Sequence, residues 1–362
     1  MKKNNHFRAL LAIAMMLCVA LPTLAHDFEV DGIYYNYLDE TAKTVEVTYK
    51  GLSAINDPNE YTGDVEIPTS VTYSGTSYSV TAIGKNAFFN CTELTSIRIS
   101  SSITNIEVGA FYGCNKLSSL IIEDSEVPLS LKAQSVLTNL GKGTFYDSTL
   151  ETIYLGRNLL YESNAQNGYS PFYSKKTLKS VTISKLVTEI EDYCFYKCSG
   201  LTIATIPNSV VTIGKRAFEG CSSLTGNLVI PNSVKSIGSS AFGYCKGFVN
   251  IEIPNSVESI GSDAFIFCSG LTGTLIIPNS VTSIGKAAFF GCSKLTSVNI
   301  PNTVTTIENQ TFYQCEGLIS IELPNSVTSI GSAAFYECLN LKSIKIPSTL
   351  MSIGDVAFKK CI

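Results

Sequence analysis

The sequence predicts a solenoid, a stack of short coils that share one long core and one parallel β-sheet. A twelve-residue stretch, VTSIGKAAFFGC at Val281–Cys292, recurs in close copies down to the last residues of the sequence. The Phe of this stretch occurs nine times between Phe172 and Phe358, at steps of 23 or 24 residues. A fixed period in the twenties is typical of solenoids, in which each unit packs only against its neighbours.

One unit, residues 295–315, shows how each coil is expected to form. Its Val298 and Ile300 point inward and alternate with polar residues, as in a strand with one buried face. Pro301 has no backbone N–H to donate, so the strand is expected to end there, and Asn302 suits the turn that follows. The Phe segment, AxFxxC in the sister units, is expected to form a short helical turn with its Phe and Cys inward.

A Gly follows the second buried Ile of most units, and this fixed place predicts a backbone bend with positive φ. These glycines are Gly84, Gly214, Gly238, Gly261, Gly285, Gly331 and Gly354. Each unit has one apolar face that it cannot bury alone, so the units are expected to stack their strands into a parallel sheet.

Three regions are expected along the chain. Residues 1–25 are typical of a secretory signal peptide, with a basic start, an apolar run at Ala9–Leu21 and small residues at the end. Residues 26–78 alternate apolar and polar residues and carry a hairpin signal at Ser74–Gly75, which predicts a small N-terminal β cap. Residues 79–362 hold about twelve repeat units. As an alternative to a purely structural cap, the tyrosines of residues 26–78 would bind a ligand.

Two steps between successive Phe residues are longer than the others. The first contains an insertion near residues 123–143, and the second contains one near residues 156–170. Insertions in repeat proteins become loops on one face, so these segments are candidate binding loops. The alternative is that they are tolerated without a function.

Composition excludes several functions. The chain has only two His residues; His6 would be lost with the leader and His26 would lie at the new N-terminus. A Ser-His-Asp, Cys-His or two-His zinc site therefore cannot be built. The carboxylates are scattered, and we expect no catalysis, no metal site and no cofactor. A net charge of −4 supplies no basic surface for nucleic acid. The apolar run of the leader is too short to cross a bilayer, so no membrane span is expected.

Ten of the twelve Cys residues occupy one repeat position: Cys91, Cys114, Cys198, Cys221, Cys245, Cys268, Cys292, Cys315, Cys338 and Cys361. Equivalent side chains in a stack point the same way, whereas a disulfide needs Cβ atoms that face each other. We therefore expect buried free thiols that fill the core, with disulfides in an exported protein as the alternative. Ser148 and Ser174 are interpreted as replacing this Cys in two units.

The outward side chains of the predicted sheet differ from unit to unit, so specificity is expected there. They mix charged, hydroxyl and aliphatic groups, which suits an extended contact with a protein or glycan, and a merely solvated strand face is the alternative. The candidate binding residues are Arg98, Tyr154, Thr182, Thr205, Glu252, Asn299, Glu322 and Lys345. Outside this face, the Asn of each Pro-Asn turn is expected to stack into a ladder between coils, or to bind a glycan: Asn208, Asn232, Asn255, Asn279, Asn302 and Asn325.

The pattern LxxIxIPNSVTxIGxxAFxxC, repeated over Ile83–Ile362, resembles the BspA-type leucine-rich repeat. The opening FEVDGIYYNY at Phe28–Tyr37 is similar to that of many secreted members. The resemblance implies a leucine-rich-repeat-like right-handed coil with a parallel sheet, and a protein that is exported, often surface-exposed and in several cases adhesive. The family supplies no motif of catalytic or ligand-binding residues to place on this chain.

The leading hypothesis is an exported, non-catalytic, adhesin-like scaffold, secreted or held at the cell surface. It would bind an extracellular protein or glycan of host or neighbouring cells through its strand face or its inserted loops. A structural surface spacer without a specific ligand is the second hypothesis, and a hydrolase that works through carboxylates alone is the third. Only the first requires the outward residues, because a spacer tolerates their replacement and a hydrolase depends on a single carboxylate.

Overall fold

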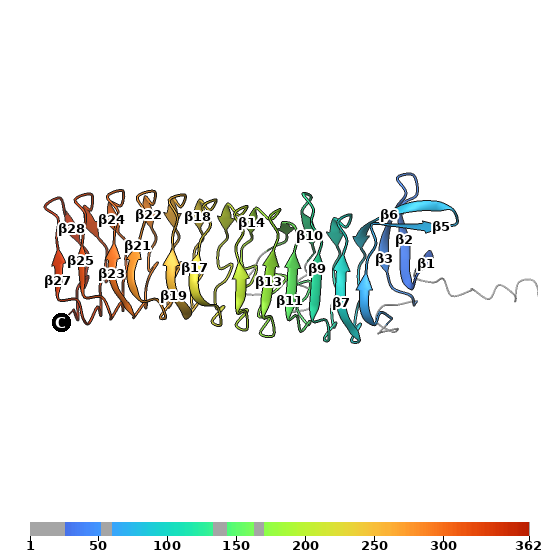
Figure 1. The fold of residues 1–362 in the computed structure, drawn as a ribbon, viewed down its shortest axis with the longest axis horizontal. Coiled ribbons are helices and arrows are strands. Elements are labelled where there is room, and N and C mark those ends of the chain that lie inside the picture. Colours follow the sequence, from blue (N-terminus) through green and yellow to red (C-terminus); the bar gives the residue numbers. More distant parts are fainter. Residues whose placement is uncertain (1–25, 52–59, 133–142, 163–169, 362) are drawn as a thin grey trace, which may run out of the picture.

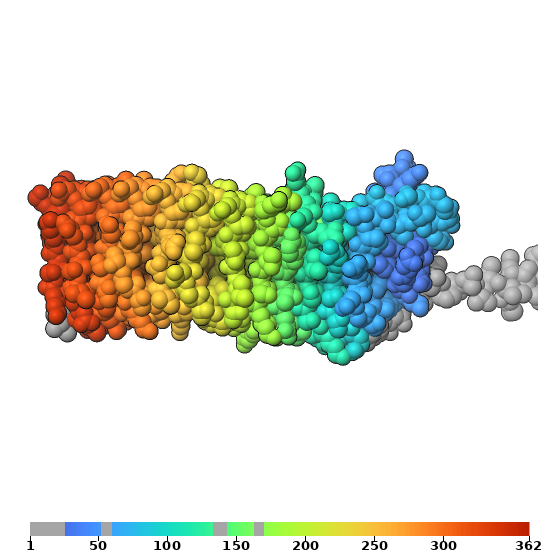
Figure 2. Space-filling view, in the orientation of Figure 1, coloured from blue at the N-terminus to red at the C-terminus, as the bar shows by residue number. Residues whose placement is uncertain are grey.

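The computed structural model describes residues 26–51, 60–132, 143–162 and 170–361. They form a rod of stacked coils, with the N-terminal cap at one end and the last coil at the other (Figure 1). The space-filling view shows one continuous body from the cap to the last coil (Figure 2). All regular elements in these ranges are β-strands, β1 to β28. The predicted solenoid is confirmed, while the predicted signal peptide at residues 1–25 lies outside the described residues.

Each coil contributes one strand to each of two sides of the rod (Figure 1). The first side, the long-strand face, consists of β4 (Gly63–Glu66), β7 (Leu94–Ile99), β9 (Ser119–Ile122), β11 (Thr152–Leu155), β13 (Ser180–Ile183), β15 (Ile203–Thr205), β17 (Thr225–Val229), β19 (Gly247–Glu252), β21 (Gly273–Ile276), β23 (Leu295–Asn299), β25 (Ser320–Glu322) and β27 (Ser343–Lys345). The second side, the short-strand face, consists of β6 (Thr76–Ile83), β8 (Asn105–Ile106), β10 (Leu129–Leu131), β12 (Leu159–Leu160), β14 (Glu189–Ile190), β16 (Thr212–Ile213), β18 (Ser236–Ile237), β20 (Ser259–Ile260), β22 (Ser283–Ile284), β24 (Thr306–Ile307), β26 (Ser329–Ile330) and β28 (Ser352–Ile353). Paired strands within a face run parallel, so equivalent residues of successive coils lie side by side.

The long-strand face is divided twice, between β15 and β17 and between β19 and β21. The pairing of β17 with β19 and of β21 with β23 shifts register beside Gly226 and Gly273, which have φ values of 81° and 70°. In each pair the skipped residue lies on the following strand, Val249 of β19 and Thr296 of β23. The coils that contain β17 and β21 span 24 residues between Phe positions, one more than their neighbours, and both strands are unpaired with the strand before them.

The Phe segment of each coil is a series of β-turns, so the predicted helical turn is wrong. In residues 261–268, the N–H groups of Asp263, Phe265 and Phe267 donate to carbonyl oxygens of the next coil at 2.8, 2.8 and 2.6 Å. The N–H groups between them close turns within the coil, such as the one from Cys268 to the Phe265 carbonyl at 3.1 Å. Asp263 and Phe267 have φ values of 57° and 53°. A helix would use these N–H groups internally, whereas the turns leave every second one for the neighbouring coil.

The repeated Gly does not have the positive φ that its fixed place predicts. All seven of these glycines lie outside the left-handed region. Instead, the preceding coil packs directly against most of them. A Cβ on Gly261 would lie 2.6 Å from the Ser239 nitrogen and 2.7 Å from the Gly238 carbonyl carbon. The prediction is corrected: the Gly permits close approach of two backbones.

Replacement of Gly261 by Ala is expected to lower the free energy of unfolding by about 1–3 kcal/mol, because the coils must shift to admit the Cβ. Glu308 occupies the same position in its own coil and already carries a Cβ. Glu308→Ala is therefore the matched control and should change stability by less than about 0.5 kcal/mol. Urea unfolding followed by circular dichroism measures both, and equal midpoints would contradict the explanation.

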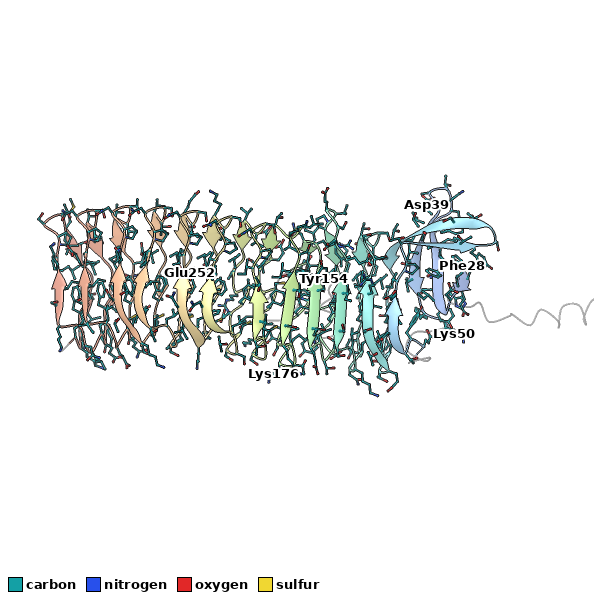
Figure 3. All side chains as sticks on the ribbon, in the orientation of Figure 1. Phe28, Asp39, Lys50, Tyr154, Lys176 and Glu252 are labelled. Carbon is teal, nitrogen blue, oxygen red and sulfur yellow. The ribbon has the colours of Figure 1, made fainter. Side chains whose placement is uncertain are left out.

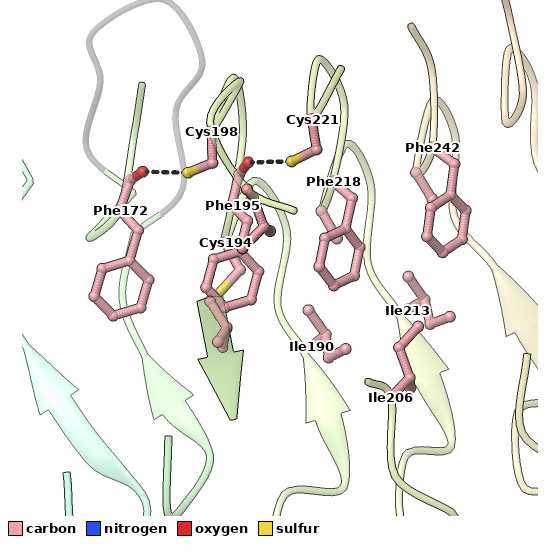
Figure 4. Packing of buried hydrophobic residues seen from close by; sticks show 14 of the residues in the cluster. Phe172, Ile190, Cys194, Phe195, Cys198, Ile206, Ile213, Phe218, Cys221 and Phe242 are labelled. Carbon is pink, nitrogen blue, oxygen red and sulfur yellow. Dashed lines mark hydrogen bonds between the residues drawn. The ribbon is translucent and has the colours of Figure 1, made fainter. Parts of the chain in front are cut away.

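One column of Phe rings runs through the whole array. Twelve rings, from Phe88 to Phe358, stack with adjacent centroids 5.0–5.8 Å apart. Figure 4 shows part of this column, from Phe172 to Phe242. Tyr61 closes its N-terminal end, with a ring centroid 4.5 Å from that of Phe88. The column is the shared core that the period of the sequence indicates.

The Cys column lies beside the rings and makes a contact that sequence reasoning missed. The eleven Cys residues of the described part are free thiols, and all except Cys361 are buried. In nine coils the Sγ lies 3.0–3.3 Å from the carbonyl oxygen of the Phe in the preceding coil, as Figure 4 shows for Cys198 and Cys221. Burial raises the pKa of the Cys268 thiol to about 12. The column fills the core, as expected, and it also donates weak hydrogen bonds between coils.

Lys175, and not Ser174, replaces the Cys in the coil of Phe172. Lys175 follows Phe172 by three residues, as the Cys follows the Phe elsewhere, so the interpretation of Ser174 is wrong by one position. In the coil of Phe145, Ser148 does occupy the Cys position. Lys175 is 3% exposed, and its Nζ donates to the carbonyl oxygens of Tyr146 and of Ser148, the latter at 2.9 Å. Burial lowers the pKa of Lys175 to about 8.

Comparison with a Lys175→Met variant should reveal this buried ammonium through the pH dependence of the free energy of unfolding. Between about pH 8 and pH 10.5 the folded chain has lost the Lys175 proton while the unfolded chain keeps it. The unfolded state then binds more protons, so the wild-type chain should gain about 3 kcal/mol of stability over the variant as pH rises through this window. Lys176→Met, at the exposed neighbour, is the control and should show no gain. Urea unfolding across the window gives both values.

The N-terminal cap consists of β1 (Phe28–Val30), β2 (Ile33–Asp39), β3 (Thr44–Thr48) and β5 (Ser70–Tyr73), packed against β6. β5 and β6 form the predicted hairpin, with Ser74 and Gly75 at φ values of 48° and 80°. The aromatic residues of the cap pack on one another, and the Phe28 and Tyr73 centroids are 4.4 Å apart. β4 pairs with β7, so the array begins at Gly63, inside the segment predicted as the cap.

Parts of the two segments predicted as insertions belong to regular coils. β10 lies between β8 and β12 in the short-strand face, and β12 itself falls in the second segment. These strands form part of the regular coils because the side chains of Leu129, Leu131 and Leu159 are buried in the shared core. Residues 133–142 and 163–169, where the rest of the insertions lie, are outside the described residues. A binding role for them stays a prediction.

Candidate functional site

The eight candidate binding residues lie in one row along the long-strand face. Strand pairing places Arg98 beside Ile121, Ile121 beside Tyr154, Tyr154 beside Thr182, and Thr182 beside Thr205. The row continues with Val229 beside Glu252, and then with Ile276, Asn299, Glu322 and Lys345 in order. Figure 3 labels Tyr154 and Glu252 along this face. The two divisions of the face split the row into three sections.

The first section carries a polar hollow of about 460 Å³. The Arg98 Nε donates to the Glu123 carboxylate at 2.8 Å, and the Tyr154 hydroxyl donates to the Asp124 carboxylate at 2.8 Å. Glu123 also accepts the backbone N–H of Ser101 at 3.0 Å. The hydrogen bond to Asp124 raises the pKa of Tyr154. Sequence reasoning singled out Arg98 and Tyr154. The two acidic residues that hold them lie at the start of the segment near residues 123–143 that it predicted as a candidate binding loop, but it did not single them out.

Beneath this hollow lies Arg157, a fully buried residue that sequence reasoning also missed. Its guanidinium donates to four backbone carbonyl oxygens, those of Ser100, Ser101, Ile103 and Glu123, at 2.8–3.1 Å. These carbonyls belong to the two preceding coils, so one side chain fixes both of them. The available signal was the sequence Gly156–Arg157 where most units have Pro-Asn.

Replacement of Arg157 by Met should lower the free energy of unfolding by about 3 kcal/mol, because four carbonyl oxygens, two of them in fully buried hydrogen bonds, lose a charged donor. Arg98→Met removes an Arg whose side chain is 42% exposed and is the matched control. That change should cost less than about 1 kcal/mol, as is usual for exposed ion pairs. Hydrogen exchange near Ser100–Ile103 should rise in the Arg157 variant alone. An unfolding midpoint equal to that of the control would contradict the assignment.

The central section, β17 and β19, exposes aliphatic side chains. They are Val229 and Val249, and Ile203 of β15 and Ile276 of β21 border it; the four are 48–62% exposed. They flank the two divisions of the face, and a hollow that includes Thr205 lies at the first division. Exposed aliphatic side chains grouped on one face are a common feature of interaction surfaces.

The third section is polar and repetitive. Glu322 and Lys345 form an ion pair at 2.5 Å, with side chains that are 70% and 74% exposed. A shallow hollow of about 740 Å³ here is lined mainly by the Ser, Asn and Pro residues that recur in each unit. Water screens such an exposed pair, so its contribution to stability is small.

The predicted Asn ladder is not formed. The six Asn side chains are exposed, and within the part of the chain that the structure describes none of them hydrogen-bonds a neighbouring coil. The residue after the Asn makes the bond instead: the Ser209 hydroxyl donates to the Val187 carbonyl at 2.6 Å, and the Ser233 hydroxyl donates to the Val210 carbonyl at 2.6 Å. The side chain of this residue, unlike that of the Asn, is directed at the preceding coil.

The one His of the described ranges lies at the edge of the cap. This residue, His26, contacts the carbonyl oxygen of Lys50 at 2.9 Å. No cluster of three or more His, Cys, Asp or Glu residues able to hold a metal ion occurs between residues 26 and 361 where placement is described. Over the same ranges, no helix has the length and apolar character that crossing a membrane requires.

An elongated array with one variable face and a repeated interior defines a repeat-protein scaffold for binding. The family model that matches the chain is that of the BspA type leucine-rich repeat region, over residues 67–164, 127–225, 166–276 and 271–362. The chain belongs to this family. BspA-type repeat proteins are typically secreted or surface-exposed, and leucine-rich repeats generally serve in protein binding.

The chain is similar to several solved structures. A leucine-rich repeat protein from Bacteroides ovatus is 28% identical, with a TM-score of 0.60 and 93% of each chain covered. A leucine-rich cell surface protein from Faecalibacterium prausnitzii is 25% identical, with a TM-score of 0.47, and the match covers 92% of this chain and 80% of that one. The pneumococcal vaccine antigen PcpA is 20% identical, with a TM-score of 0.48 and coverage of 91% and 85%. No curated protein matches the chain.

Proposed function

We propose that the chain is an exported, adhesin-like scaffold that binds an extracellular protein or glycan through its long-strand face. The observation that carries this proposal is the row from Arg98 to Lys345. Its members lie in register on one face, yet their chemistry changes from coil to coil. The inward residues of the same coils are nearly constant Phe, Cys, Ile and Val. A surface that varies over a constant interior is suited to recognition.

Binding would be spread along the row, with a few residues dominating. Interface energy concentrates in central, well-packed anchors, and the surrounding polar contacts mainly exclude water. The exposed aliphatic side chains of the central section fit the first description and the polar end sections fit the second. The segments near residues 123–143 and 156–170 remain candidates for a second contact.

Export is part of the proposal. The basic start and apolar run of residues 1–25 support a signal peptide, as does membership of a family that is typically secreted or surface-exposed. A bacterial host that expresses the full chain should release a product that begins at His26, and N-terminal sequencing of the exported fraction reads this directly. A product that keeps residues 1–25 inside the cell would contradict export.

Binding can be tested with the exported chain, fluorescently labelled, on host cells and on neighbouring bacterial cells by flow cytometry. A face variant with Thr182→Glu, Thr205→Glu and Glu252→Lys should lose about tenfold or more in apparent affinity. The matched control exchanges Lys235 and Glu258, an exposed ion pair beside the short-strand face. This control, Lys235→Glu with Glu258→Lys, should bind like the wild-type chain.

The outcomes separate this proposal from a structural spacer. If the chain binds no cell surface, or if the face variant binds as well as the control, the binding scaffold is wrong. A spacer would tolerate the face variant and would depend on the number of coils instead. Unfolding midpoints of both variants should match that of the wild-type chain, so that a loss of binding reports on the surface.

A further inference from the structure

The polar hollow of the first section differs in kind from the other hollows of the long-strand face. It is lined by Arg98, Ser101, Ile121, Glu123, Asp124 and Tyr154. The hollow at the first division is lined largely by aliphatic and Thr side chains, and the hollow near the last coils by the recurring Ser, Asn and Pro residues. Only the first of these three combines an aromatic ring, a guanidinium and two carboxylates. It is an open hollow of about 460 Å³.

The polar groups of this hollow are held in place before any ligand arrives. Asp124 fixes the Tyr154 hydroxyl at 2.8 Å, and Glu123 fixes both the Arg98 guanidinium at 2.8 Å and the Ser101 N–H at 3.0 Å. The side chains of Arg98 and Glu123 are still 42% and 28% exposed, so they keep hydrogen-bonding capacity toward solvent. Fixed groups lose little conformational entropy on binding, which favours affinity.

The backbone under the hollow is also fixed. The buried Arg157 guanidinium binds the carbonyl oxygens of Ser101 and Glu123, two residues of the lining, at 3.1 and 3.0 Å. In the four coils around the hollow, Ser100–Ser101, Glu123–Asp124, Gly156–Arg157 and Ser184–Lys185 stand where most units have Pro-Asn. The departures from the repeat are therefore concentrated at this hollow, where they supply both its lining and its support.

The chemistry of the lining suits a neutral carbohydrate. Sugar hydroxyls both donate and accept, so they can bind carboxylates and a guanidinium in the same hollow. The aromatic ring of Tyr154 and the aliphatic Ile121 offer apolar surface to the C–H groups of a pyranose. The guanidiniums of Arg98 and of Arg157 beneath it balance the two carboxylates, so the hollow has no net positive charge that would attract sulfated or sialylated sugars.

We propose that this hollow is a subsite for a neutral glycan, with Tyr154 as the stacking platform and Glu123, Asp124 and Arg98 as hydroxyl ligands. The inference rests on the proposed binding function of the long-strand face, and it names the class of ligand at one end of that face. The central section is then a separate contact. A glycan that occupies the first section would leave the second free for another part of the same target.

The test uses the exported chain and isothermal titration against neutral hexasaccharides of the cello, malto, xylo and manno series, with sialyllactose and heparin as acidic comparisons. Tyr154→Ala should weaken neutral binding by about tenfold or more. Tyr154→Phe keeps the ring and should retain most of the affinity, while Asp124→Asn should weaken binding by removing an anionic acceptor. Tyr244→Ala removes an exposed Tyr from the turn side of the rod and is the matched control.

The results distinguish this inference from the proposed function. Binding of a neutral hexasaccharide that Tyr154→Ala weakens and Tyr244→Ala leaves intact supports the subsite. Binding of the acidic sugars alone, of no sugar, or an equal loss in both Tyr variants overturns it. If cell binding is lost in the face variant but no sugar binds, the scaffold stands and the glycan subsite falls. If sugar binds through Tyr154 but no cell surface is bound, the subsite stands and the adhesin-like function falls.

Discussion

The fold depends on contact between coils, because no coil can satisfy its own backbone. In the Phe segment every second N–H group donates to the next coil, and the Phe rings stack at 5.0–5.8 Å along the whole rod. Most thiols reach the Phe carbonyl of the coil before them, and Gly261 and its equivalents let the backbones approach. A lone coil would expose its apolar face and leave these donors unpaired, so the array is stable only as a stack.

This constraint explains why departures from the repeat take the form they do. Lys175 stands in the Cys column, and its ammonium donates to carbonyl oxygens of the preceding turn. Arg157 stands near the Pro-Asn turn and binds four carbonyls of two preceding coils. Both are long cationic side chains buried among backbone acceptors that need donors. The irregular coils are therefore held as firmly as the regular ones, and they present a different outer surface.

A constant interior leaves the long-strand face free to vary. Its first section is preorganised around Tyr154, its centre exposes the aliphatic Val229 and Val249, and its end carries the exposed pair of Glu322 and Lys345. The face is divided before β17 and before β21, in the two coils that carry one extra residue. One face can thus offer distinct contacts to different parts of an extended target.

The sequence by itself determined the period, the Phe and Cys columns, the hairpin at Ser74–Gly75 and the row from Arg98 to Lys345, because local alternation and recurrence encode them. Only the tertiary structure decided the rest. It replaced the helical turn by β-turns, gave the inter-coil bond to Ser209 and not to Asn208, and placed Lys175 and Arg157 under the irregular coils. Each of these depends on which group of the neighbouring coil lies opposite. The stacking of coils fixes that partner, whereas the pattern within one unit does not.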